Sequence, residues 1–151
     1  MTARLFMDSN PVLVHPSDTI GVTAGKIMQR RYRSLPVVDD DRRFLGVVTV
    51  NCMLRLVLPK AATMKKGVDS VAYFDTTLDD LRSRLRKYID KPVSICLDED
   101  VVVVDPNTPL LETLLTLYHE KSNLPVVDKT SGRLEGMISY YDVGEKIMEG
   151  F

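Results

Sequence analysis

The sequence predicts an α/β (α+β) fold made of two tandem copies of one unit, each a small sheet with flanking helices, packed as a pseudo-two-fold pair. Three blocks recur in the same order with offsets of 90, 89 and 90: VLVHP (12–16), LPVVD (35–39) and GVVT (46–49) return as VVVDP (102–106), LPVVD (124–128) and GMIS (136–139). One copy is too short to bury its own sheet, so the two are expected to share a core. We expect the first copy at 1–58, a linker at 59–91 and the second copy at 92–151.

Each copy is expected to begin with an apolar, β-branched strand that ends at a proline, followed by a helix. In the first copy, the predicted inner face of the helix carries Ile20, Ala24, Ile27 and Met28. In the second copy, Thr108 is the predicted N-cap and Pro109 the first helical residue. The helix face that follows carries Leu110, Leu111, Leu114, Leu115 and Tyr118.

The LPVV runs predict buried strands, because a continuous apolar run suits a sheet covered on both faces. Polar turns at 39–43 and 128–133 follow. A second short strand then ends at Thr49 or Ser139, where another helix is expected to begin.

The linker is expected to contain an amphipathic helix at about 77–89, after a mobile stretch around 60–67. Thr76 and Thr77, with Asp79 and Asp80 three residues later, have capping-box spacing. Apolar residues recur at helical spacing from Leu78, and the arginines and lysine between them predict a solvated face. Dimerisation, partner docking and bracing remain open as roles for this helix.

Bulk properties exclude several classes of protein. The 151 residues are 44% apolar and 27% charged, with a net charge of -1, as in an ordinary soluble protein and not a nucleic-acid binder. No apolar run approaches the roughly 20 residues that span a bilayer, and no signal peptide is evident, so we expect no membrane insertion and a cytoplasmic location.

Cysteines and histidines give no sign of a metal site or of catalysis. Cys52 and Cys96 lack CxxC spacing and are expected to be two reduced thiols. His15 and His119 stand apart, with no ligand cluster around them. No nucleophile–base motif is recognisable, so we do not expect the chain to be an enzyme or to require a cofactor.

These blocks resemble the cystathionine-β-synthase-type (CBS) domain family over roughly two thirds of the chain. Each block alone is weak evidence for the family, whereas all three blocks, in the same order in both copies, are specific for it. The resemblance implies a CBS pair whose clefts bind adenosine nucleotides or related ligands. It also implies a homodimer and the control of an enzyme or transporter that this sequence does not identify.

The family's most informative motif, Gly-apolar-apolar-Thr/Ser-x-x-Asp, is complete in the second copy as Gly136, Met137, Ile138, Ser139 and Asp142. The resemblance implies that Asp142 binds the ribose hydroxyls and that Ser139 faces the phosphate. A carboxylate is an acceptor that suits a vicinal diol, and a helix start offers free N–H groups to a phosphate. Ser139 and Asp142 also have capping-box spacing, and one pair can do both.

The first copy departs from this motif, because Cys52 stands where the family has its aspartate. A thiol is a weak hydrogen-bonding group that cannot replace an anionic acceptor for a diol. We therefore expect one competent cleft per chain. The weaker cleft would pair Thr49 with residues of the second copy, namely Val101, Lys121, Ser122 and Asn123.

In this family the base is held largely by the opposite copy, which assigns further residues to the Ser139 and Asp142 cleft. By position these are Phe6, Met7, Pro11, Tyr32, Arg33 and Ser34. Arg33 either reaches a phosphate or faces solvent, and Tyr140 and Tyr141 either stack on a ligand or pack against the protein.

The function expected from this resemblance is a standalone regulatory sensor of adenine nucleotides, with AMP as the ligand, that passes its occupancy to a partner protein. The alternative is a CBS scaffold or interaction module that binds no ligand.

Overall fold

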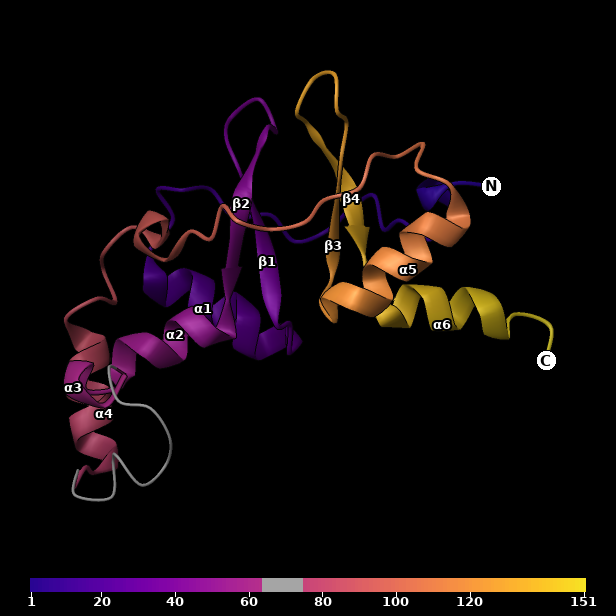
Figure 1. Ribbon diagram of the computed structural model, residues 1–151. Coiled ribbons are helices and arrows are strands. Elements are labelled where there is room, and N and C mark those ends of the chain that lie inside the picture. Colours follow the sequence, from indigo (N-terminus) through magenta and orange to yellow (C-terminus); the bar gives the residue numbers. More distant parts are fainter. Residues whose placement is uncertain (64–74) are drawn as a thin grey trace.

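The two copies form two similar halves that lie side by side in the computed structural model, which describes residues 1–63 and 75–151 (Figure 1). The first half consists of α1 (Ile20–Arg30), β1 (Ser34–Val38), β2 (Phe44–Thr49) and α2 (Val50–Val57). The second half consists of α5 (Leu110–Glu120), β3 (Leu124–Val127), β4 (Leu134–Ile138) and α6 (Tyr140–Met148). This arrangement confirms the predicted fold class and the pair of repeats.

Each half contains an antiparallel hairpin. β1 pairs with β2 so that Leu35 lies opposite Val48, and β3 pairs with β4 so that Leu124 lies opposite Ile138. The valine-rich runs predicted as strands make only single parallel bridges, from Val14 to Val37 and from Val104 to Val126. The predicted third strand of each sheet is therefore reduced to one residue pair.

The hairpins meet at their tips, where the two-fold relation between the copies is closest. The backbone N–H of Phe44 donates to the carbonyl of Gly132 at 2.9 Å, and that of Leu134 donates to the carbonyl of Arg42 at 2.9 Å. The guanidinium of Arg42 also donates from Nε to the carbonyl of Leu134 at 2.8 Å. These contacts fix the angle between the halves, and Figure 1 shows the two hairpins side by side.

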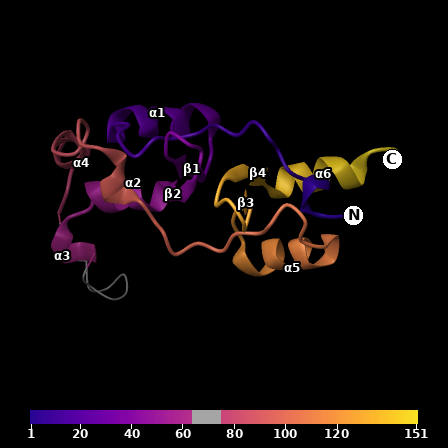
Figure 2. The same ribbon diagram turned by 90° about the horizontal axis from the view of Figure 1, so that it is seen from above.

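Each copy exchanges its entry segment with the other copy. Residues 1–8, which include η1 (Ala3–Leu5), pack on the second half, and Asp8 exchanges two backbone hydrogen bonds with Met137 at 2.8 and 3.0 Å. Residues 91–98, which include η3 (Val93–Cys96), pack on the first half, and Asp98 exchanges two with Val47 at 2.8 and 2.9 Å. The N-terminal segment therefore starts beside α5 and α6 and then crosses to α1 (Figure 2).

The exchange also appears in the packing of the core. Val93 and Cys96 are buried with the first copy's Val14, Ile20 and Val48. Ala3 and Phe6 are buried with residues of the second copy, namely Val104, Leu117, Leu124, Val126 and Ile138. A third cluster, of Val38, Leu134 and Met137, joins the two halves. The shared core that the sequence predicts is built by swapped segments as well as by facing sheets.

Helix ends follow the sequence signals, with one shift. The Thr19 side chain accepts a hydrogen bond from the N–H of Val22, and α1 ends at Arg31 in a left-handed conformation, φ 56°. Helix α5 begins at Leu110 with Pro109 as its N-cap residue. Thr108, predicted as the N-cap, instead accepts a hydrogen bond from the N–H of Asp105 at 3.0 Å.

The predicted inner faces of α1 and α5 were partly wrong. Four of the residues predicted there are exposed, namely Met28 (62%), Leu111 (69%), Leu115 (48%) and Tyr118 (70%). Thr23 and Thr113 are fully buried at equivalent places in the two copies. The Thr113 hydroxyl donates to the carbonyl of Pro109 at 3.0 Å, which explains how a polar side chain is tolerated in the core.

The linker contains α3 (Lys60–Thr63) and α4 (Leu78–Arg86). The predicted capping box is present: Thr77 Oγ1 accepts from the N–H of Asp80 at 3.2 Å, and Asp80 accepts from the N–H of Thr77 at 2.9 Å. The hydrogen bond from the Thr77 backbone holds the pKa of Asp80 below its usual value. Helix α4 ends three residues before the predicted boundary at 89. In the predicted mobile stretch, 60–63 is helical, and 64–67 lies outside the described residues.

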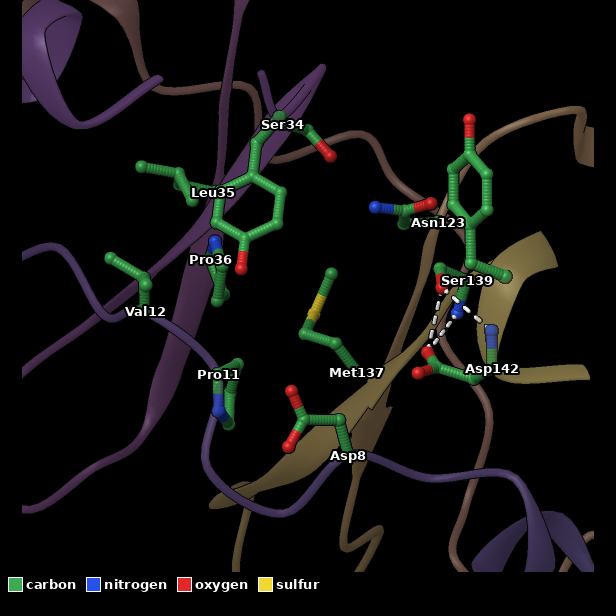
Figure 3. Close-up of a pocket in the computed structure, with 12 residues that line it drawn as sticks. Asp8, Pro11, Val12, Ser34, Leu35, Pro36, Asn123, Met137, Ser139 and Asp142 are labelled. Carbon is green, nitrogen blue, oxygen red and sulfur yellow. Dashed lines mark hydrogen bonds between the residues drawn. The ribbon is translucent and has the colours of Figure 1, made fainter. Parts of the chain in front are cut away.

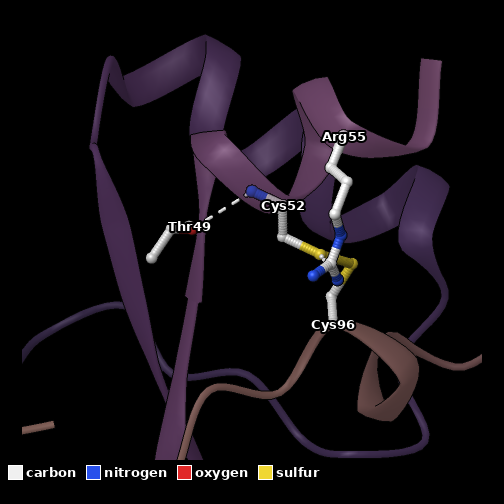
Figure 4. Close-up of a disulfide and its surroundings, with 4 residues drawn as sticks. All are labelled: Thr49, Cys52, Arg55 and Cys96. Atoms are coloured by element: carbon white, nitrogen blue, oxygen red, sulfur yellow. Dashed lines mark hydrogen bonds between the residues drawn. A yellow bond between two sulfur atoms is a disulfide. The ribbon is translucent and has the colours of Figure 1, made fainter. Parts of the chain in front are cut away.

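The expectation of two reduced cysteines is corrected by the structure. Cys52, in α2, and Cys96, in η3, are joined by a disulfide, so no free cysteine remains (Figure 4). The exchanged segment 91–98 brings Cys96 against α2, which sequence spacing could not reveal. Arg55 Nη2 lies 3.3 Å from Cys52 Sγ.

Candidate functional site

A cleft of about 230 Å³ lies between the two halves and is lined from both copies (Figure 3). On one side are Val12, Ser34, Leu35 and Pro36; on the other are Met137, Ser139 and Asp142. The remaining lining residues are Asp8, Pro11, Tyr32, Asn123 and Tyr141. The volume lies somewhat below the roughly 300–1,000 Å³ of common ligand pockets, which limits the occupant to one small molecule.

The start of α6 forms the polar wall of this cleft. Ser139 is the N-cap residue: its hydroxyl accepts from the N–H of Asp142 at 3.1 Å, and its own N–H donates to Asp142 Oδ2 at 2.7 Å. The Ser139 hydroxyl also donates to Asp142 Oδ2 at 2.7 Å. The capping role that the spacing predicted is therefore confirmed.

The capping box leaves part of the Asp142 carboxylate available. All its hydrogen bonds to other described residues use Oδ2, and none uses Oδ1. The side chain is half-buried and borders the cleft. The first-turn N–H groups of Tyr140 and Tyr141 have no partner inside the helix, as in any first turn. This end of the cleft thus presents an acceptor for a diol beside donors for an anion.

The charge of the cleft is negative, because Asp8 and Asp142 line it and no lysine or arginine of the described residues does. Because the Ser139 hydroxyl donates to Asp142 Oδ2, the N–H groups at the start of α6 are the donors that remain for an anion. In residues 1–63 and 75–151, no group of three His, Cys, Asp or Glu side chains could hold a metal ion.

The structure brings together six of the predicted cleft residues: Pro11, Tyr32, Ser34, Met137, Ser139 and Asp142. Phe6 and Ile138 are buried in the core, and Met7 packs against the same cluster. Gly136 faces Met7 and the Asp8 carbonyl, and Arg33 is exposed and borders neither cleft.

Sequence reasoning missed Asp8, Val12, Leu35, Pro36 and Asn123 in this cleft. Asp8 carries a signal that could have been used, since Asp98 follows it at the same offset of 90 as the other blocks. The two tyrosines differ. The Tyr140 hydroxyl donates to the carbonyl of Leu117 at 2.8 Å, so this side chain contacts the protein. Tyr141 is 83% exposed at the edge of the cleft.

A second cleft, of about 220 Å³, occupies the two-fold-related position. Thr49, Val101, Ser122 and Asn123 line it as predicted by position, whereas Lys121 does not. Three acids, Asp98, Asp100 and Glu120, also line it. The position equivalent to Asp142 offers no carboxylate, because it holds Cys52, whose sulfur is bonded to Cys96.

Comparison with known proteins agrees with this architecture. The family model for the CBS domain matches residues 3–59 and 92–149, and the chain belongs to this family. No match was found among curated proteins. No helix in the described part of the chain has the length and apolar character needed to cross a membrane.

Solved structures share the fold at low sequence identity. The CBS-pair protein CBSX2 from Arabidopsis thaliana is 23% identical with a TM-score of 0.71, over 97% of this chain and 93% of that one. CBSX2 has also been solved in complex with AMP; that structure is 24% identical with a TM-score of 0.69, over 97% and 95%. MJ1004 from Methanocaldococcus jannaschii is 20% identical with a TM-score of 0.70, over 97% of this chain and 59% of that one.

Proposed function

We propose that the chain is a regulatory sensor that binds an adenine nucleotide in the cleft of Ser139 and Asp142. The observation that carries this proposal is the unshared Asp142 Oδ1 beside the first turn of α6, in a cleft walled by both copies. The ribose diol would donate to Asp142 Oδ1, and the phosphate would accept from the helix N–H groups and, once its proton turns away from Asp142, from the Ser139 hydroxyl. The AMP complex of CBSX2 supports this choice of ligand class.

The charge of the cleft favours AMP over ADP and ATP as the ligand. Each further phosphate adds negative charge beside Asp8 and Asp142, and in the part of the chain that the structure describes no lysine or arginine lines the cleft to offset it. One phosphate at the start of α6 is the charge that this wall can stabilise.

Ligand binding between the two halves would stabilise one arrangement of them, and a partner protein would respond to that arrangement. We propose a regulatory and not a catalytic role. A homodimer is part of the proposal, supported by apolar side chains exposed on the helices, namely Val22, Met28, Leu54, Leu111, Leu115, Ile147 and Met148. A cytoplasmic location remains a prediction, and the disulfide is the observation that weighs against a reducing compartment.

The variant Asp142→Ala tests the proposal. In the parent protein, AMP at a hundred times its dissociation constant should stabilise the fold by about 2.7 kcal/mol, measured as a rise in melting temperature. Removal of the carboxylate should weaken AMP binding by roughly 10- to 100-fold, because hydrogen bonds to a charged group are worth about 1.5–3 kcal/mol. The ligand-induced shift at a fixed AMP concentration should then largely disappear.

Asp80→Ala is the matched control. It removes the acid of the other capping box, in α4, at a residue that does not border the cleft. Both variants should lose a similar, small contribution of the capping box to stability, and only Asp142→Ala should lose the response to AMP.

A scaffold without a ligand is the second candidate, because the first copy has already replaced the ribose-binding group with a disulfide cysteine. An unchanged melting temperature of the parent protein with AMP, ADP, ATP and S-adenosylmethionine would favour the scaffold.

A further inference from the structure

A pocket of a different character is lined by residues of α2, α3 and α4 and of the segments beside them. Figure 1 shows α3 and α4 together at the outer end of the first half. The pocket has a volume of about 390 Å³ and is lined by the C-terminal ends of α2 and α4 and by α3. Four basic side chains border it: Arg55, Lys60, Arg84 and Lys87. Among residues 1–63 and 75–151, no acidic side chain borders it, whereas both clefts between the halves are bordered by acids and by no described lysine or arginine.

The basic side chains are not neutralised by ion pairs with the described residues. None of the four has a described carboxylate within 4.0 Å. Asp80 lies close enough to Arg84 for that charge to contribute to its lowered pKa, but its carboxylate is engaged by the backbone of Thr77. Arg84 itself donates to Thr76 Oγ1, a neutral partner, at 3.2 Å.

Helix ends explain only part of this charge. The C-termini of α2 and α4 each carry the equivalent of roughly half a negative charge, which one cation between them would offset. Four cations therefore leave an excess of about three positive charges around one pocket. Their mutual repulsion favours an anionic occupant.

Several groups at this pocket are held in place before any ligand arrives. Arg55 lies against the disulfide, with Nη2 at 3.3 Å from Cys52 Sγ (Figure 4). Tyr88 and Arg84 are half-buried at its wall. Two arginines held at a concave surface, with two exposed lysines beside them, suit the multiple oxygens of a phosphate chain.

We propose that this basic pocket binds a small compound with two or more linked phosphate groups, at a place separate from the nucleotide cleft. The proposal does not depend on the cleft being functional. The phosphate chain is the recognised group, whether it is inorganic or part of a nucleoside polyphosphate.

The test is a calorimetric titration with inorganic tripolyphosphate at low and at physiological salt. The parent protein should show saturable binding that weakens steeply with salt. The double variant Lys60→Gln/Lys87→Gln should weaken it by about tenfold or more, since both side chains are exposed and make no other described contact through their ammonium groups. Circular dichroism checks that the variants fold.

The matched control is Arg82→Gln/Arg86→Gln, which removes the same two charges from α4 at positions that do not border the pocket. It should change the affinity less than threefold. Equal losses in the two double variants would reduce the effect to overall charge and overturn the proposal, as would the absence of saturable binding in the parent.

Asp142→Ala separates this site from the cleft. Tripolyphosphate binding should be unchanged in Asp142→Ala, and its loss there would place the phosphate chain in the cleft and overturn the proposal. In the same variant, ATP affinity equal to or above that of tripolyphosphate supports the basic pocket. Failure of ATP to bind where tripolyphosphate binds restricts the ligand to inorganic chains.

Discussion

Replacement of both cysteines, as Cys52→Ala/Cys96→Ala, is expected to lower the free energy of unfolding by about 3–4 kcal/mol. The bond joins residues 44 positions apart, and a cross-link over a loop of that length strongly restricts the unfolded chain. Urea titration measures the change directly. The melting temperature should fall by roughly 10 °C.

Reduction provides the control for this prediction. A reductant should destabilise the parent by a similar amount and leave the double variant unaffected. In the folded parent the reaction should be slow, because Cys52 and Cys96 are only 8% and 4% exposed. Alkylation of two thiols in the unfolded, unreduced parent would contradict the bond, and with it the expected effect.

The exchange of entry segments leads to the second large effect, expected for Gly136→Ala. A Cβ at this position would collide with Met7 Cγ and with the backbone carbonyl of Asp8. The backbone cannot yield without breaking the two hydrogen bonds between Asp8 and Met137. We expect a loss of about 2–3 kcal/mol in the free energy of unfolding, together with faster proteolysis of residues 1–8.

Gly144→Ala is the matched control for this change. A Cβ at Gly144 would meet nothing within 4 Å, and the residue lies inside α6, so alanine should stabilise the fold by about 0.5–1 kcal/mol. Gly46→Ala should resemble Gly136→Ala, because the Asp98 carbonyl blocks its Cβ and its φ of 152° favours glycine. A small effect at Gly136 would show that the entry segment is loosely held.

The repeat was the part of the fold that the sequence predicted best. Local sequence patterns determine the hairpins, the helices after Thr49 and Ser139 and the α4 capping box. Such patterns involve residues close together in the chain, so they can be read directly from the sequence. The wrong inner faces of α1 and α5 have a physical reason. Each helix turns a buried threonine, Thr23 or Thr113, toward the core, and larger apolar side chains that were expected to face the core are exposed instead.

Contacts between segments that are distant in the sequence could not be predicted from local patterns. The exchange of 1–8 and 91–98 uses backbone hydrogen bonds, which any residue can make, so it leaves little trace in side-chain identity. The disulfide depends on that exchange. The same limit applies to the cleft, where Ser139 and Asp142 follow from a motif but Asp8 and Asn123 come from remote segments.

Calorimetric titration with AMP tests the central claim of one competent cleft per chain. The Lys60→Gln/Lys87→Gln variant is the appropriate protein, because the weakened basic pocket then adds little to the signal. We predict one AMP bound per chain, with binding greatly weakened when Asp142→Ala is added. Two equivalent sites would contradict the loss of the first-copy cleft, and no binding would contradict the nucleotide sensor itself.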